Sequence, residues 1–141
     1  MIAVDTSALM AIVLDEPEAN ACISVLATDE EIVISAGTVA EAQMVAARRN
    51  VGQEMEQLIE RLGFTVVDVT AASARRVAEA YDNWGKGARP AGLNFGDCFA
   101  YEVAKERGCP LLHVGGDFAR TDVQSALDAR RPDGFQQAAG E

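Results

Sequence analysis

The chain has 141 residues, of which 49% are hydrophobic and 24% are charged, so we expect one soluble globular domain with its own core. Its 12 basic and 22 acidic residues give a net charge of −10, which argues against broad electrostatic binding of nucleic acid and favours cations or a basic partner. No apolar run reaches the roughly 18 residues of a membrane span, the N-terminus lacks the features of a signal peptide, and three cysteines without zinc-site spacing suggest reduced thiols in the cytoplasm.

Apolar runs and helix-capping residues alternate along the chain. The spacing predicts strands at 2–4, 31–35, 64–67 and 111–114, and helices at 8–14, 17–26, 36–50, 52–63, 70–84 and 94–107. We expect Thr6 or Ser7 to cap the first helix. We expect the helix at 70–84 to turn Ala74, Val77, Ala78 and Tyr81 inward.

The predicted strands are uninterrupted apolar runs rather than alternating ones. This is typical of a parallel sheet that helices cover on both faces. We therefore predict an α/β fold with a central parallel sheet of four to five strands, the fifth near Val123. The domain should span residues 1–128, and residues 129–141 should form a polar C-terminal tail.

The stretch from Leu93 to Tyr101 combines a helix start with an acid. Asn94 is a good N-cap, which places Asp97 in the first helical turn, where the helix dipole favours a carboxylate. Asp97 could therefore simply complete a cap, and this stretch alone does not separate that role from a functional one.

Three further acids lie at similar ends of elements. Asp5 ends the first strand, Glu41 lies in the helix after the second, and Asp117 follows the fourth. Ligands bind beyond the carboxyl ends of the strands in open α/β sheets, so all four acids could meet at one edge. Converging carboxylates repel one another unless cations are present, and an all-oxygen site suits Mg²⁺ or Mn²⁺.

Each acid also has a structural alternative. Asp5 could cap the first helix, and Thr38 with Glu41 matches the spacing of a capping box. Asp117 could be a turn residue, and Asp122 is either a further ligand or a surface acid. If all of these alternatives were true, four acids would have to lie at similar ends of elements by chance.

The acid-bearing segments are Val4–Leu9, Ser35–Glu41, Leu93–Cys98 and Gly116–Asp122. In their order and spacing, from Met1 to about Ala126, the chain resembles the PIN-domain family, and more narrowly the VapC toxins of type II toxin–antitoxin systems. The resemblance implies a PIN-like fold with metal ligands and catalytic acids at Asp5, Glu41, Asp97 and Asp117, supported by Thr6, Ser7, Asn94 and Asp122. The pair Gly115-Gly116 departs from the more usual pattern of the family, so Asp122 stays an alternative to Asp117.

The activity implied by this resemblance is that of a Mg²⁺- or Mn²⁺-dependent endoribonuclease acting on structured RNA such as tRNA or rRNA loops. Carboxylates would hold the metal, and a water would attack the phosphorus in line. The resemblance also implies inhibition by a cognate antitoxin and a homodimer, in the cytoplasm and away from membranes.

Cations and one aromatic residue flank the acids in the sequence. Lys86, Arg89 and Arg120 could bind RNA phosphates, and Trp84 could stack on an unpaired base. Solvated cations and a packed indole are the structural alternatives. We expect His113, inside an apolar strand, to be structural rather than a general base.

Two other kinds of function remain open. The first is a non-catalytic PIN-like module whose acids bind only a metal or a basic protein. The second is a phosphatase with Asp5 as its nucleophile, which Ser7 disfavours because such enzymes need a second Asp at that position.

Overall fold

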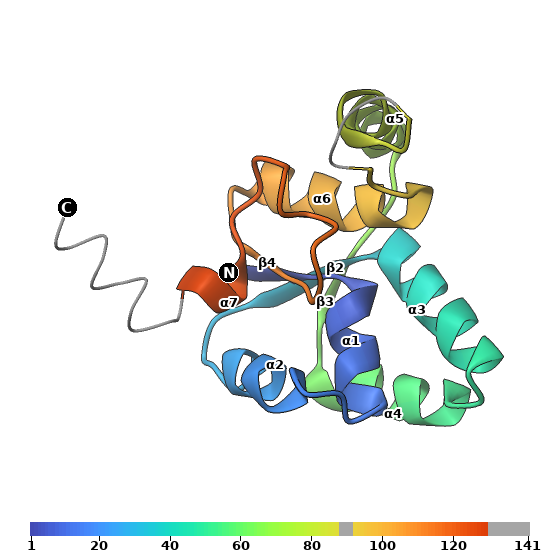
Figure 1. Cartoon of the computed structure of the whole chain (residues 1–141), viewed down its shortest axis with the longest axis vertical. Coiled ribbons are helices and arrows are strands. Elements are labelled where there is room, and N and C mark those ends of the chain that lie inside the picture. Colours follow the sequence, from blue (N-terminus) through green and yellow to red (C-terminus); the bar gives the residue numbers. More distant parts are fainter. Residues whose placement is uncertain (88–91, 130–141) are drawn as a thin grey trace, which may run out of the picture.

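The computed structural model describes residues 1–87 and 92–129, in which short strands alternate with helices (Figure 1). The strands are β1 (Ile2–Val4), β2 (Ile32–Ser35), β3 (Thr65–Val67) and β4 (Leu111–Leu112). The helices are α1 (Thr6–Val13), α2 (Ala19–Leu26), α3 (Ala36–Arg48), α4 (Gly52–Leu62), α5 (Ala71–Trp84), α6 (Phe95–Arg107) and α7 (Ala126–Ala129). The predicted tail lies outside the described residues from position 130 onward.

The four strands form one parallel sheet in the order β3-β2-β1-β4. Ile2 pairs with Ile32, and Ala3 pairs with both Val33 and Leu111. The strand order reverses between β1 and β4, which is where open α/β sheets place their ligands. The prediction of a parallel α/β sheet is confirmed.

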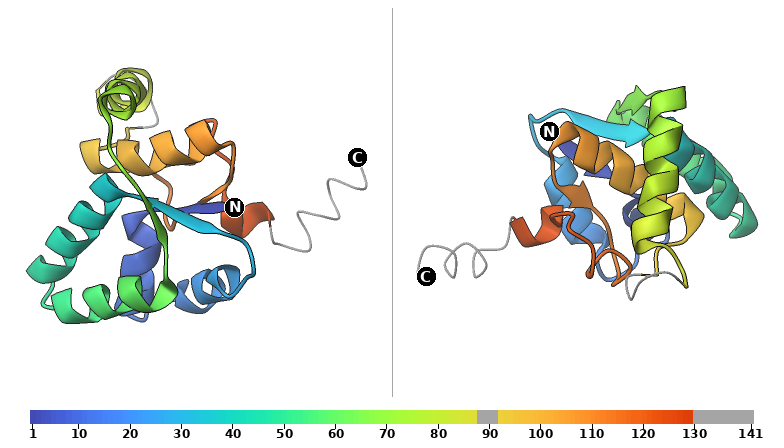
Figure 2. Two further views of the ribbon diagram at one scale, coloured as in Figure 1. Left: turned by 180° about the vertical axis from the view of Figure 1, so that it is seen from behind. Right: turned by 90° about the horizontal axis from the view of Figure 1, so that it is seen from above.

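Strands β1, β2 and β4 are buried on both faces, to which their successive side chains point in turn, whereas the edge strand β3 is mostly exposed, with Val66 at 48%. Ile2, Val4 and Ile34 belong to the core under α1, α2, α3 and α4, whereas Ala3 and Val33 belong to the core under α5 and α6. Figures 1 and 2 show these two layers on either side of the sheet. Two buried faces explain why the strands are continuously apolar.

The last strand is shorter than predicted, and no fifth strand is present in the described residues. β4 ends at Leu112, two residues before the expected end, because the Val114 N–H donates to the Ser7 hydroxyl instead of extending a strand. The segment near Val123 makes a single bridge, between Leu111 and Ser125, before α7 begins.

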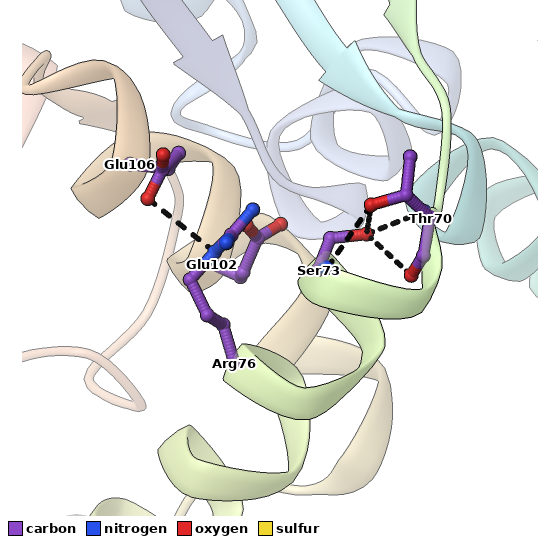
Figure 3. A network of polar contacts seen from close by, with 5 residues as sticks. All are labelled: Thr70, Ser73, Arg76, Glu102 and Glu106. Carbon is purple, nitrogen blue, oxygen red and sulfur yellow. Dashed lines mark hydrogen bonds and ion pairs between the residues drawn. The ribbon is translucent and has the colours of Figure 1, made fainter.

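Helix α5 lies on α6, outside the sheet, and ionic contacts join the two helices (Figure 3). The Arg76 Nε donates to Glu102 Oε2 at 2.8 Å and lies 3.3 Å from Glu106 Oε1. Thr70 and Ser73 form a capping box that starts α5. None of the helices in the described ranges combines the length and the apolar character needed to cross a bilayer.

The predicted inner face of α5 is right only at Val77. The buried positions are Ser73, Val77 and Ala80, whereas Ala74, Ala78 and Tyr81 are exposed. Because α5 packs on one helix rather than on the sheet, it buries only a narrow stripe, and sequence hydrophobicity did not determine which stripe that is.

Candidate active site

Asp5 connects the central strand β1 to α1 at the carboxyl edge of the sheet. It is 2% exposed, and it rather than Thr6 or Ser7 is the N-cap of α1. Its Oδ2 accepts hydrogen bonds from the Ser7 N–H at 3.0 Å and from the Ser7 hydroxyl at 2.7 Å. Its Oδ1 is buried without a hydrogen-bond partner among the described residues. A buried acceptor without a partner is costly, so this oxygen is suited to a cation.

Glu41 reaches the same place from α3. Ser35 is the N-cap of α3, so the alternative in which Thr38 caps a helix together with Glu41 is wrong. Instead, the Thr6 hydroxyl donates to Glu41 Oε1 at 2.7 Å. A Cβ added to Gly96 would collide with the Glu41 carboxyl group, with Oε1 only 2.9 Å away. Glu41 therefore lies between the start of α1 and the start of α6.

Asp97 is both a capping residue and a member of this acid group. Its Oδ2 accepts from the Asn94 N–H at 3.1 Å, and its own N–H donates to Asn94 Oδ1 at 3.0 Å. The N-cap predicted at Asn94 is confirmed, and the capping box that it forms with Asp97 holds Asp97 at 6% exposure beside the other carboxylates.

The carboxylates act on one another electrostatically. Burial raises the pKa of Asp5 to about 7; the hydrogen bonds from Ser7 oppose this, and the charges of Asp97 and Glu41 add to it. Burial also raises the pKa of Asp97 to about 6, opposed by the hydrogen bond from Asn94 and increased by the charges of Asp117 and Glu41. Raised pKa values of buried carboxylates beside other acids are typical of functional sites.

Of the two candidates for the fourth acid, the structure brings only Asp117 to this group. Asp117 is exposed in the turn after β4, and its charge raises the pKa of Asp97. Asp122 instead accepts from the Tyr101 hydroxyl at 2.6 Å and lies 3.3 Å from Lys105 Nζ. Asp122 thus pairs with two residues of α6, Tyr101 and Lys105.

The proposed RNA-binding residues lie in different surroundings. Lys86 is exposed, and its charge lowers the pKa of Asp97, which places it near the acids. Arg120 is exposed in the turn after Asp117, and Arg89 lies outside the described residues. Trp84 is half-buried, and its Nε1 donates to the Tyr101 hydroxyl at 3.0 Å. The roles of these four residues in binding RNA stay predictions.

His113 directly follows β4 and packs on Phe118, with 4.9 Å between ring centroids. Burial lowers its pKa, against the opposing charges of Asp128 and Asp117. A neutral, packed imidazole agrees with the structural role expected for it.

Sequence reasoning missed Gly96 as part of the site. Glycine in the first turn of a helix is unfavourable relative to alanine, and its place beside Asp97 was the only signal available. The structure supplies the reason, since a Cβ at this position would collide with the Glu41 carboxyl group and force it to move.

The donor set fits a hard divalent cation, because it consists of carboxylate oxygens, one of them buried and unpartnered. Within residues 1–87 and 92–129, however, no three Asp, Glu, His or Cys side chains already enclose an ion-sized site. Hydrogen bonds hold Asp5, Glu41 and Asp97 individually. Mg²⁺ commonly keeps several water ligands and binds through one or two carboxylates, so a complete protein cage is not required.

A model of the PIN domain matches residues 2–124, and the chain belongs to this family. Among its relatives, ribonuclease VapC28 of Mycobacterium tuberculosis is 42% identical over 131 residues, covering 90% of this chain and 98% of that protein. Ribonuclease VapC of Mycolicibacterium smegmatis is 40% identical over 123 residues, covering 85% and 95%. The chain is therefore a VapC-type PIN-domain protein, and the resemblance drawn from its motifs is confirmed.

Solved structures support the same fold. The crystal structure of M. tuberculosis VapC20, described as a sarcin-ricin loop cleaving toxin, aligns with a TM-score of 0.72 at 19% identity, covering 87% of this chain and 96% of that one. VapBC2 from Rickettsia felis, bound to a DNA fragment from its promoter, aligns with a TM-score of 0.66 at 17% identity, covering 89% and 96%.

Proposed function

We propose that this protein is a metal-dependent endoribonuclease toxin that hydrolyses phosphodiester bonds in structured RNA such as tRNA or rRNA. The observation that carries the proposal is the buried Oδ1 of Asp5, which has no hydrogen-bond partner among the described residues and lies in a group where the charges of Asp97 and Glu41 add to the raised pKa of Asp5. The VapC ribonucleases among its relatives support the same activity.

The metal would be Mg²⁺, with Mn²⁺ as a plausible substitute, held by Asp5, Glu41, Asp97 and Asp117. When bound, it would offset the repulsion among the carboxylates, polarise a phosphodiester and lower the pKa of the attacking water. Catalysis then needs no nucleophile from the protein.

The surrounding residues keep the carboxylates in place for this chemistry. Ser7 orients Asp5, Thr6 orients Glu41, and Asn94 orients Asp97 through the hydrogen bonds described above. Partners of this kind reduce the motion of ligand side chains, and their loss commonly weakens metal binding or activity about 10- to 100-fold.

Substrate binding would use the cations at the rim. Lys86, Arg89 and Arg120 are proposed to contact RNA phosphates, and Trp84 a base. With a net charge of −10, phosphate binding must stay local to these residues and the metal.

We also propose a cognate antitoxin as the inhibitor, in the cytoplasm where RNA substrates occur. Solved neighbours include a toxin–antitoxin complex from Klebsiella pneumoniae, with a TM-score of 0.63, and the acidic surface suits a basic partner. The proposed homodimer is supported by large apolar side chains exposed beside the site, with Phe95 63% and Met44 50% exposed.

Sequencing of RNA ends after induced expression tests the activity. Wild type should create new 5′ ends at defined positions, whereas Asp97→Asn and Asp5→Asn should reduce cleavage at least about 100-fold because each removes a ligand charge. Asp29→Asn is the matched control, because Asp29 is exposed in the segment before β2, at the opposite edge of the sheet.

The alternative function is a non-catalytic module that binds a metal or a protein through the same acids. That function would be supported, and the nuclease contradicted, if the wild-type chain bound Mg²⁺ or its partner yet produced no new RNA ends. Cleavage that persists in both Asn variants would also contradict the assignment of the site.

A further inference from the structure

A cavity of about 310 Å³ lies between the start of α2, the segment that follows β4, and α7. We call it the α2–α7 cavity. Its walls include Glu18, His113, Val114, Phe118, Ser125 and Asp128. The volume is at the lower end of the range of about 300–1,000 Å³ for ligand sites, which suits a group of few atoms rather than a large cofactor.

This cavity is joined to the acid group through short hydrogen bonds. The N–H of Val114, in the cavity wall, donates to the Ser7 hydroxyl at 3.0 Å, and this hydroxyl donates to Asp5 at 2.7 Å. Gly115 also lines the cavity and precedes Asp117 by two residues. A substrate held at the carboxylates would therefore have its neighbouring groups close to this cavity.

The chemistry of the walls favours a neutral ligand that donates hydrogen bonds. Two acidic residues, Glu18 and Asp128, line the cavity at exposed positions, and no lysine or arginine occurs among the described residues that line it. Ionised carboxylates accept hydrogen bonds and do not donate them, so a phosphate group would be repelled here. Val114, Phe118 and Leu127 add apolar surface that suits a flat ring.

Glu18 provides the acceptor on the α2 side. It occupies the N-cap position of α2, where a carboxylate commonly accepts from backbone N–H groups, yet its side chain makes no such capping hydrogen bond. Glu18 is exposed and lines the cavity.

Resting on the proposed function, we propose that the α2–α7 cavity binds the base of a guanosine adjacent to the cleaved phosphodiester in the RNA. Guanine presents its N1–H and its 2-amino group side by side, and the two oxygens of the Glu18 carboxylate can accept from both. Uracil offers one N–H at that edge, and adenine and cytosine offer one amino group. Proteins commonly read unpaired RNA bases at this edge.

This recognition also explains how an acidic protein can select RNA. The negative walls repel phosphates but accept hydrogen bonds from a guanine edge, so sequence selection and phosphate binding occur at different places. Phosphate binding stays with the proposed metal and with Lys86, whose charge acts on Asp97.

The test uses the full chain with Mg²⁺ and a library of RNA hairpins with randomised loops, whose cut ends are sequenced. Wild type should prefer guanosine at one position beside the cut by about 10- to 100-fold over adenosine, the discrimination expected of a good bidentate contact. Inosine at that position, which lacks the 2-amino group, should be cut at an intermediate rate.

Glu18→Gln should reduce the preference for guanosine to less than about threefold while leaving cleavage of the adenosine-containing RNA unchanged. Glu54→Gln, on an exposed position of α4, is the control and should keep the wild-type preference. Free guanosine monophosphate at micromolar concentration should not inhibit cleavage, because the RNA presents the base together with the cleaved phosphate.

Cleavage without a guanosine preference, or an equal loss on every RNA in Glu18→Gln, would overturn the guanine site while leaving the nuclease assignment intact. Inhibition by micromolar guanosine monophosphate would mean that the cavity serves a free nucleotide and would also overturn it. If wild type cuts no RNA in the library and none in cells, the proposed function itself fails.

Discussion

At the scale of single residues, the acid group depends on neighbouring residues that restrict the position of each carboxylate. Asp97 could be only a cap and Glu41 only part of a capping box with Thr38, but Asn94 and Thr6 hold them beside Asp5. A neighbour that hydrogen-bonds to one oxygen of a carboxylate fixes the conformation of the side chain. The direction of the second oxygen is then set by the fold rather than by the rotamer preference of the side chain. Gly96 lies next to the Glu41 carboxyl group, so a side chain at this position would disturb the acid group.

Gly96→Ala should separate stability from function. Alanine normally stabilises a helix interior relative to glycine by about 0.5–1 kcal/mol, but here its methyl group would collide with the Glu41 carboxyl group and displace it. We expect a Tm within a few degrees of wild type, together with at least about tenfold weaker Mg²⁺ binding by calorimetry and slower RNA cleavage.

Gly52→Ala is the matched control for this substitution. It also lies in the first turn of a helix, but its added Cβ would meet its nearest neighbour at 3.6 Å, an ordinary contact distance. Unchanged Mg²⁺ affinity in Gly96→Ala would contradict the tight contact with Glu41.

At the scale of elements, three helices begin around the acids. Asp5 is the N-cap of α1, Ser35 is the N-cap of α3, the helix that carries Glu41, and Asn94 is the N-cap of α6. The N-terminus of a helix favours negative charge, so these helix starts partly offset the repulsion among the carboxylates. Their convergence requires the parallel sheet, whose strands all end at this edge.

Tyr101 on α6 connects the end of α5 with the turn that follows Asp117. Its hydroxyl accepts from Trp84 Nε1 at 3.0 Å and donates to Asp122 at 2.6 Å. Trp84 ends α5 shortly before Lys86, and Asp122 lies in the turn that follows Asp117. Tyr101 therefore connects the end of α5, near Lys86, with the turn that follows Asp117.

Tyr101→Phe should lower the Tm by about 2–4 °C, because it removes two hydrogen bonds of modest net value. It should also weaken Mg²⁺ binding a few fold, measured by calorimetry, because the turn that carries Asp117 loses a restraint. Tyr81→Phe, at an exposed position of α5, should change neither quantity, and equal effects of the two substitutions would contradict this role for Tyr101.

At the scale of the whole molecule, buried acids make the stability of the metal-free chain depend on pH. Asp5 has a pKa of about 7 in the folded chain, raised chiefly by burial from the ordinary 3.8. As pH rises between these two values, the unfolded chain releases its proton first, so the folded state loses relative stability. Asp97, with a pKa raised to about 6, adds to the effect over a narrower range.

Thermal unfolding in EDTA should therefore show a Tm that falls from pH 5 to pH 8, with a loss on the order of 3 kcal/mol or less from Asp5. Asp5→Asn should flatten this slope, because the amide does not titrate. Mg²⁺ should raise the Tm most at pH 8, since it binds the ionised carboxylates of the folded chain. A Tm that rises over this range in EDTA would contradict the burial of Asp5.

The order of strands and helices, the two-sided burial of the sheet and the presence of acids at its carboxyl edge were predictable from the sequence. The apolar runs and the capping residues Asn94 and Thr70 are local signals, and parallel strands bring their ends to one edge whatever the details of packing. The motif order was also sufficient for the VapC-type resemblance.

Only the tertiary structure decided which way side chains face once an element is formed. It placed Glu41 against Thr6 and Gly96, bound Asp122 to Tyr101 and Lys105, and turned Tyr81 outward. The phase of a helix about its axis and the path of a turn are set by packing between segments far apart in the chain. Local spacing therefore specified where the acids lie along the chain, and packing decided which of them meet.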